Sequence, residues 1–189
     1  MPDPHPLVLI LDASCLLNLY ATGRFGEILV VSLYRFAVAD YVLDEEALFT
    51  LVRESFDGPL ERAPVDLRPF IEDGLVEVMS VESTEEIATF VDLAIQIDDG
   101  EAITASLAAH RGCAVATDDR KARRVIAEQA PTVPLVSTLD LLSEWAEASQ
   151  MSMSELKSVF AAMQTGASYV PGRRDPRFDW WVEVMQEEV

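Results

Sequence analysis

The sequence predicts an α/β domain in three layers, with a central, mostly parallel sheet that is covered by helices on both faces. Short apolar runs alternate along the chain with longer amphipathic segments, which is typical of parallel sheets. The run at residues 7–11 is apolar throughout, as expected for a strand buried on both faces. Half of the 189 residues are hydrophobic, which is enough for one domain of ordinary size and an appendage.

Three strands and three helices are expected in the first half of the chain. The strands are the apolar runs at residues 7–11, 36–39 and 75–79. The helices have amphipathic or acidic-first patterns and occupy residues 16–20, 44–53 and 85–95. Either Asp12 or Ser14 caps the first helix, because both residue types accept hydrogen bonds from the N–H groups that begin a helix. Gly58 and Pro59 mark a break before the third strand.

The second half continues the alternation as far as residue 149, and we assign residues 1–149 to one domain. An Ala-rich helix at residues 101–110 ends at Gly112, the residue type that most often terminates helices. Short strands follow at residues 113–116 and 134–137, separated by a basic helix that begins at residue 120. Thr138 is expected to cap the helix at residues 139–148.

Beyond residue 149 the alternation stops, and residues 150–189 are expected to form a C-terminal helical extension. Ser152 and Glu155 have the spacing of a capping box and open a helix toward residue 164. A final amphipathic stretch contains Trp180 and Trp181. It packs on the domain, mediates self-association into a homodimer, or binds another partner.

The charge balance excludes one class of nucleic-acid-binding protein. Lys and Arg number 14 and Asp and Glu number 33, so the net charge is −19. Binding to nucleic acid through bulk positive charge is therefore not expected. A nuclease whose metal ions supply the positive charge is compatible with this net charge. The two cysteines lie among apolar residues, the N-terminus has no basic leader, and no run of about 20 apolar residues occurs. These features predict a cytoplasmic protein without a membrane partner.

Four separate segments bring carboxylates toward the carboxyl end of the predicted sheet, where open parallel sheets bind ligands. These carboxylates are Asp12, Glu45 and Glu46, Asp98 and Glu101, and Asp118 and Asp119. Because carboxylates at one edge repel each other, they require a cation, and the hard ions Mg²⁺ and Mn²⁺ prefer oxygen ligands. Such an ion suits the hydrolysis of phosphodiesters.

Each acidic segment also has a simpler explanation when it is taken alone. Asp12 and the Asp118–Asp119 pair are also explained as helix caps, and Glu45, Glu46 and Glu101 as acidic residues of a first helical turn. The agreement of four segments on one end of the sheet favours a shared site. The chain has two histidines, and neither follows a candidate strand, so histidine acid–base chemistry is not expected.

The acidic segments resemble, in order, the four motifs of the PIN-domain family. This family contains metal-dependent ribonucleases, including the toxins of many toxin–antitoxin pairs. The similar stretches are LILDASCLLNL at residues 9–19, VLDE at 42–45, DDGEAITASLA at 98–108 and ATDDRKAR at 116–123. The stretch TLDLL at residues 138–142 is similar to the closing strand–helix turn, so the resemblance covers roughly residues 7–149 and implies a PIN-like fold.

The resemblance implies that Asp12, Glu45, Glu101 and Asp118 or Asp119 bind one or two Mg²⁺ or Mn²⁺ ions and activate water against RNA. It also implies that Ser14 positions Asp12 or a metal-bound water. Spacing from Val42 favours Glu45 over Glu46 as the ligand, while the choice between Asp118 and Asp119 stays open. Glu46 and Asp98 are supporting candidates.

The basic residues directly after the fourth motif are candidate RNA contacts, and ordinary surface charge is the alternative. They are Arg120, Lys121, Arg123 and Arg124, and a second basic cluster contains Arg173, Arg174 and Arg177. The resemblance also implies an antitoxin as a partner. The alternative function is a PIN-like domain that no longer cuts and serves as a binding or regulatory module. No Walker loop or Gly-x-Gly-x-x-Gly turn follows any expected strand, which disfavours nucleotide-binding enzymes of those kinds.

Overall fold

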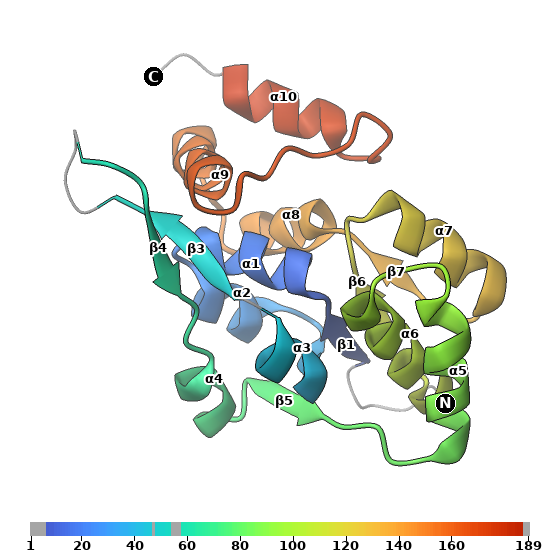
Figure 1. Cartoon of the computed structure of the whole chain (residues 1–189). Helices are drawn as coiled ribbons and strands as arrows, with labels where there is room; N and C mark the ends of the chain where they lie inside the picture. Colours follow the sequence, from blue (N-terminus) through green and yellow to red (C-terminus); the bar gives the residue numbers. More distant parts are fainter. Residues whose placement is uncertain (1–6, 47, 54–57, 187–189) are drawn as a thin grey trace.

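The computed structural model describes residues 7–46, 48–53 and 58–186, and its centre is a five-stranded parallel sheet (Figure 1). The strands lie in the order β5-β2-β1-β6-β7. Their bounds are β1 (Val8–Leu11), β2 (Arg35–Ala39), β5 (Val76–Met79), β6 (Ala114–Ala116) and β7 (Leu135–Val136). The chain adds β2 and β5 on one side of β1 and then adds β6 and β7 on the other side. A reversal of this kind opens a crevice at the carboxyl ends of the two strands beside it, here β1 and β6.

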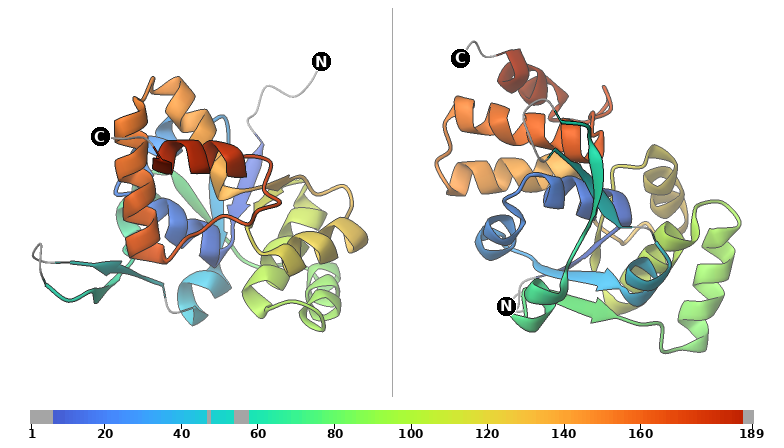
Figure 2. Two further views of the ribbon diagram at one scale, coloured as in Figure 1. Left: turned by 90° about the horizontal axis from the view of Figure 1, so that it is seen from above. Right: turned by 60° about the vertical axis from the view of Figure 1, so that its left-hand side comes forward.

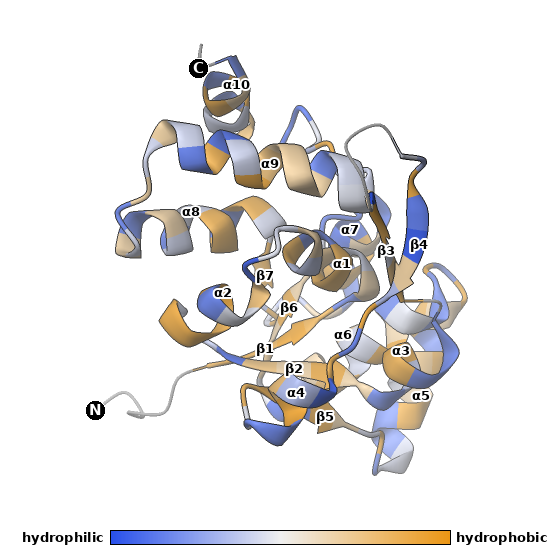
Figure 3. Ribbon diagram, turned by 90° about the vertical axis from the view of Figure 1, so that its left-hand side faces the viewer, coloured by the Kyte–Doolittle hydropathy of each residue, from blue (hydrophilic) through white to orange (hydrophobic). Residues whose placement is uncertain are grey.

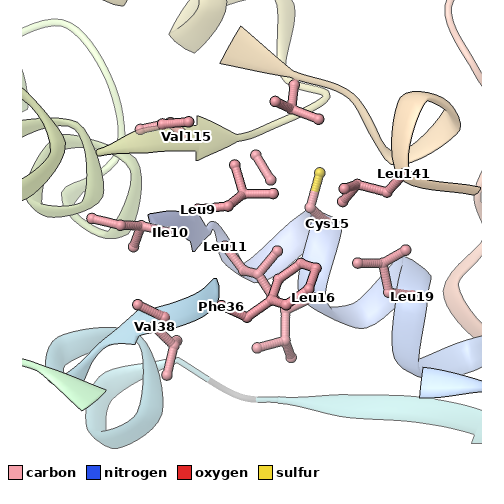
Figure 4. Close-up of a cluster of buried hydrophobic side chains, with 14 of the residues drawn as sticks. Leu9, Ile10, Leu11, Cys15, Leu16, Leu19, Phe36, Val38, Val115 and Leu141 are labelled. Atoms are coloured by element: carbon pink, nitrogen blue, oxygen red, sulfur yellow. The ribbon is translucent and has the colours of Figure 1, made fainter. Parts of the chain in front are cut away.

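The central strand β1 explains why the first apolar run is continuous. It pairs with β2 on one edge and with β6 on the other, and Leu9, Ile10 and Leu11 are fully buried. Figure 4 shows Leu9 and Leu11 close to side chains of the following helix, among them Cys15. Because Leu11 pairs with Ala116, the residues that follow β1 and β6 emerge at the same edge of the sheet.

Helices cover both faces of the sheet, which confirms the predicted three-layer architecture (Figures 1 and 3). One face carries α1 (Ala13–Ala21), α2 (Phe25–Val31) and α8 (Thr138–Ala148). The other carries α6 (Asp99–Arg111) and α7 (Arg120–Gln129), and α5 (Thr84–Ala94) packs against α6. No helix in the described ranges is long and apolar enough to cross a bilayer.

The helix predicted at residues 44–53 is wrong. A shorter helix, α3 (Asp40–Glu45), begins directly after β2, and the chain then forms β3 (Phe49–Val52), which pairs antiparallel with β4 (Glu61–Pro64). Ala47, within the predicted helix, lies outside the described residues. The sequence Phe-Thr-Leu-Val of β3 is rich in aromatic and β-branched residues, which favour strands when they find a surface to pack on. That surface is supplied by α1 and the C-terminal part of the chain.

Three smaller features also differ from the sequence-based expectation. Helix α2 and the short helix α4 (Arg68–Glu72) were not predicted. Ser137, and not Thr138, caps α8, because its hydroxyl accepts from the backbone N–H of Asp140 at 3.1 Å while the Asp140 carboxylate accepts in return. This frees Thr138 for a contact with the candidate site.

The C-terminal segment forms two helices, α9 (Met153–Ala167) and α10 (Phe178–Gln186), which Figure 2 shows lying across each other. The capping box of Ser152 and Glu155 is confirmed at the start of α9. Helix α9 packs closely on α1, and a Cβ at Gly166 would lie 3.0 Å from the Cβ of Ala21. Of the interpretations of the tryptophan stretch, packing on the rest of the chain is seen, because Trp181 is buried.

Candidate active site

Asp12 is the first residue after β1 and the cap of α1. Its carboxylate accepts from the backbone N–H of Cys15 at 2.6 Å, and the hydroxyl of Ser14 lies 3.0 Å from both of its oxygens. The backbone N–H of Asp12 donates to the carbonyl of Ala116 at 3.1 Å, so the residue is fixed against the end of β6. Burial raises the pKa of Asp12 from 3.8 to about 6, and the charge of Asp118 adds to the increase, although hydrogen bonds offset part of it. Ionised Asp12 is therefore a buried charge whose orientation is fixed.

Asp118 follows β6, and its carboxylate is oriented by residues from α1 and α8. Its Oδ2 accepts from Asn18 Nδ2 at 3.0 Å and from the Thr138 hydroxyl at 2.5 Å. Its Oδ1 accepts from the backbone N–H of Thr138 at 2.9 Å. The thiol of Cys15 lies 3.5 Å from Oδ2. Asn18 and Thr138 are functional candidates that site prediction from the sequence missed, although both lie in stretches that resemble family motifs.

Asp119 has a different environment, although it is the next residue. It is exposed and caps α7, with its Oδ1 accepting from the backbone N–H groups of Lys121 at 2.7 Å and Ala122 at 2.8 Å. A helix cap of this kind uses one oxygen and leaves the other free. The two aspartates thus differ in role, because the carboxylate of Asp118 is fixed by side chains across the site and that of Asp119 by its own helix.

Glu101 connects these carboxylates with the start of α6. It is half-buried at the third position of α6, and its Oε2 accepts from the backbone N–H of Asp98 at 3.3 Å in a capping box. The pKa of Glu101 is raised from 4.5 to about 7. Burial is the largest cause, and the charges of Asp119, Asp12 and Asp98 also raise the pKa. The charges of Asp12 and Asp119, which follow β1 and β6, thus act on a carboxylate in the first turn of α6.

Glu45 is the last residue of α3 and Glu46 is the residue that follows it, and the two side chains have different environments. Glu45 is exposed, whereas Glu46 is half-buried, with its pKa raised by burial and by the charge of Asp98. The carboxylate of Glu46 lies so close to Gly100 that a Cβ at Gly100 would clash with its Oε1. The structure therefore places Glu46 against the first turn of α6, and Gly100 permits that approach.

The four predicted RNA contacts of α7 separate into two kinds. Arg123 is held by the sheet, because its Nη1 donates to the carbonyl of Thr117 at 2.8 Å and to that of Val136 at 3.2 Å. It therefore ties the ends of β6 and β7 together. Arg120, Lys121 and Arg124 are exposed.

The donor chemistry of the site fits a hard divalent cation. Asp12, Asp118 and Glu101 present carboxylate oxygens, and the ion pairs seen in the described part of the chain, such as Arg111 with Glu86, involve other carboxylates. No three Asp, Glu, His or Cys side chains among the described residues stand close enough to form a ready-made metal cage. A Mg²⁺ site does not need one, because this ion is bound by one or two carboxylates, with waters and substrate phosphates completing its shell.

The raised pKa of Asp12 predicts how the metal-free protein responds to pH. An acid whose pKa is higher in the fold than in the unfolded chain destabilises the fold once it is ionised, so this penalty grows as the pH rises from about 4 to about 6 and persists above it. Asp12→Asn removes the charge and keeps a residue that caps helices well. We expect the variant to melt at the wild-type temperature near pH 4 and roughly 3–6 °C above it at pH 8. This shift corresponds to a gain of about 1–2 kcal/mol in the free energy of unfolding.

Thermal denaturation in EDTA, followed by circular dichroism at both pH values, measures this difference. Asp12→Ala serves as the control, because it also removes the charge but loses the cap. A variant with Asn that melts several degrees below wild type at pH 8 would assign Asp12 a purely structural role.

Comparison with known proteins gives one match. A protein-family model described as a PIN domain matches residues 8–174, which include β1, every carboxylate discussed above and α9. No curated protein is similar enough to count as a match.

Proposed function

Because the chain belongs to the PIN-domain family, we propose that it is a Mg²⁺- or Mn²⁺-dependent endoribonuclease that hydrolyses phosphodiester bonds of RNA. PIN domains are generally nucleases that use divalent metals. The observation that best supports this proposal is that Asp12 and Asp118 follow the paired strands β1 and β6, with the backbone N–H of Asp12 bonded to the carbonyl of Ala116 at the end of β6. Strands β1 and β6 lie at the reversal in strand order, and open parallel sheets bind their ligands at the carboxyl ends of such strands.

Asp12 and Asp118 are the proposed direct ligands of the ion, since both are held in place by hydrogen bonds before any ion binds. Cys15 and Ser14 fix the first carboxylate, and Asn18 and Thr138 fix the second. A divalent ion held there would supply an activated water and neutralise the charge that develops on the phosphate. Catalytic groups that are positioned in advance avoid the cost of reorganisation during the reaction.

Glu101 and Glu46 are proposed as acidic groups around the direct ligands. Both carboxylates have pKa values raised by burial and by neighbouring acidic residues. A cation at the site stabilises their ionised forms, because an opposite charge lowers the pKa of a carboxyl group. Asp119 adds negative charge at the edge of the site while it caps α7.

Glu46→Gln and Glu45→Gln together test which glutamate at the end of α3 acts. We expect Glu46→Gln to lower kcat/KM for RNA by roughly 10–100-fold, the usual cost of removing a group that supports metal ligands. Glu45→Gln removes the same charge one residue away, from an exposed position, and its loss is expected to be several times smaller. Initial rates of RNA cleavage at subsaturating substrate measure both variants. The reverse order of losses would assign the role to Glu45.

The test of the proposed function is cleavage of defined RNAs by the purified chain, with Mg²⁺, with Mn²⁺ and with EDTA. Cleavage that needs the divalent ion supports the nuclease. RNA binding without cleavage under all three conditions would support the alternative, a catalytically silent PIN-like binding or regulatory module. A toxin role and an antitoxin partner stay predictions from the resemblance, and a homodimer stays a prediction from the stretch that contains Trp180 and Trp181.

A further inference from the structure

A cavity of about 760 Å³ opens beside Asp118 and Asp119. One wall is the start of α7, and the opposite wall is the segment of residues 167–176 between α9 and α10. Ser14 and Asn18 of α1 also line it, so the cavity is continuous with the candidate active site. Figure 2 shows the segment running from the end of α9 across to the side of α7.

Four arginines line this cavity, and among the described residues only Arg123 of these four has side-chain partners. Arg120 and Arg124 come from α7 and Arg174 from the opposite segment, and their side chains take part in no hydrogen bond or ion pair within the described ranges. Three aspartates line the same cavity, but each has other partners: Asp118 and Asp119 are held as described above, and Asp175 accepts from the backbone N–H of Arg177 at 2.8 Å. In a chain of net charge −19, this is a local concentration of available cations.

The segment that carries Arg174 is fixed at both ends. At its start, Tyr169 is buried and its ring lies 5.5 Å from that of Trp181. At its end, Arg177 Nε donates to Asp140 Oδ1 at 2.8 Å. Asp140 forms the capping box of α8 with Ser137, which precedes Thr138, the residue that holds Asp118. The position of Arg174 is therefore coupled mechanically to the active site, and this wall of the cavity is preformed.

We propose that this cavity binds the phosphate backbone of a single RNA strand next to the bond that is cut, with Arg124 and Arg174 holding phosphates from opposite walls. The inference depends on the proposed function for the identity of the substrate. Guanidinium groups bind phosphate oxygens through two parallel hydrogen bonds. The volume is that of a small-ligand site, which accommodates a nucleotide and is too small for a double helix. The C-terminal segment thus completes the substrate groove.

Arg124→Ala and Arg174→Ala test the proposal, with Arg173→Ala as the matched control. Arg173 is exposed, carries the same charge and does not line the cavity. Binding of a short, labelled single-stranded RNA to the full chain is measured in EDTA by fluorescence anisotropy between 50 and 200 mM salt. We expect each cavity variant to weaken binding by about tenfold and to reduce the salt slope by about 0.7, and the control to change affinity by less than about twofold.

Equal losses for Arg173→Ala and Arg174→Ala would overturn the proposal, because only bulk charge would then matter. Equal competition by a duplex of the same sequence would also overturn it. Melting temperatures within a few degrees of wild type show that the variants fold, and Arg174→Lys is expected to restore part of the affinity. If the binding differences appear but Mg²⁺ gives no cleavage, the cavity is supported and the nuclease activity fails. If Mg²⁺ gives cleavage but the cavity variants bind RNA as well as the wild type does, the nuclease activity is supported and the proposed role of the cavity is wrong.

Discussion

Replacing Asp12 by Asn is expected to reduce divalent-dependent RNA cleavage by roughly 10³-fold while the protein stays folded. A catalytic metal contributes several kcal/mol of charge stabilisation in the transition state, and losing a buried carboxylate ligand removes most of it. Asn keeps the local structure, because it caps helices as well as Asp does and its side-chain oxygen can accept from the N–H of Cys15. The loss should appear in kcat, since the metal acts mainly in the transition state.

Initial cleavage rates of a defined RNA at saturating Mg²⁺ measure this loss. Asp66→Asn is the matched control, because it removes the same charge at a partly exposed position beside Arg68, before α4. Its rate is expected to equal that of the wild type. Undiminished cleavage by the Asp12 variant, or wild-type cleavage that continues in EDTA, would contradict the mechanism.

The parts of the fold that were predicted correctly are those whose sequence pattern is local. A strand such as β1 needs only a continuous apolar run, because its neighbours on both edges and both faces exclude water. The hairpin of β3 and β4 was missed because its strands are amphipathic, and the surface that selects the strand form comes from α1 and α9. Propensity alone does not contain that information.

The candidate site shows the same limit at the level of side chains. The positions of Asp12 and Asp118 after strands follow from the local sequence, but the partners of Asp118 are distant: Asn18 lies 100 residues before it and Thr138 follows it by 20. The preference for Glu45 over Glu46 depended on spacing within the sequence. The end of α3 at Glu45 decides which carboxylate approaches α6, and tertiary packing sets that boundary.

The aromatic cluster that fastens α10 to α9 provides the largest expected effect on stability. The ring of Trp181 stacks on that of Phe160, with centroids 4.4 Å apart and planes at 16°, and it is only 4% exposed. Replacing a buried tryptophan by alanine costs about 3–5 kcal/mol. For a chain of this length, we expect Trp181→Ala to lower Tm by roughly 10 °C.

Trp180→Ala is the natural comparison, because the neighbouring ring meets Phe160 edge-on at 5.1 Å and is partly exposed. Its loss is expected to be about 1–2 kcal/mol, as less apolar area leaves the interior. Thermal and urea denaturation measure both variants. Since Trp181 also contacts Tyr169 at the base of the Arg174 segment, its removal should raise KM for RNA at temperatures where the protein is still folded. Equal, small losses in both variants would show that α10 contributes little to the stability of the fold.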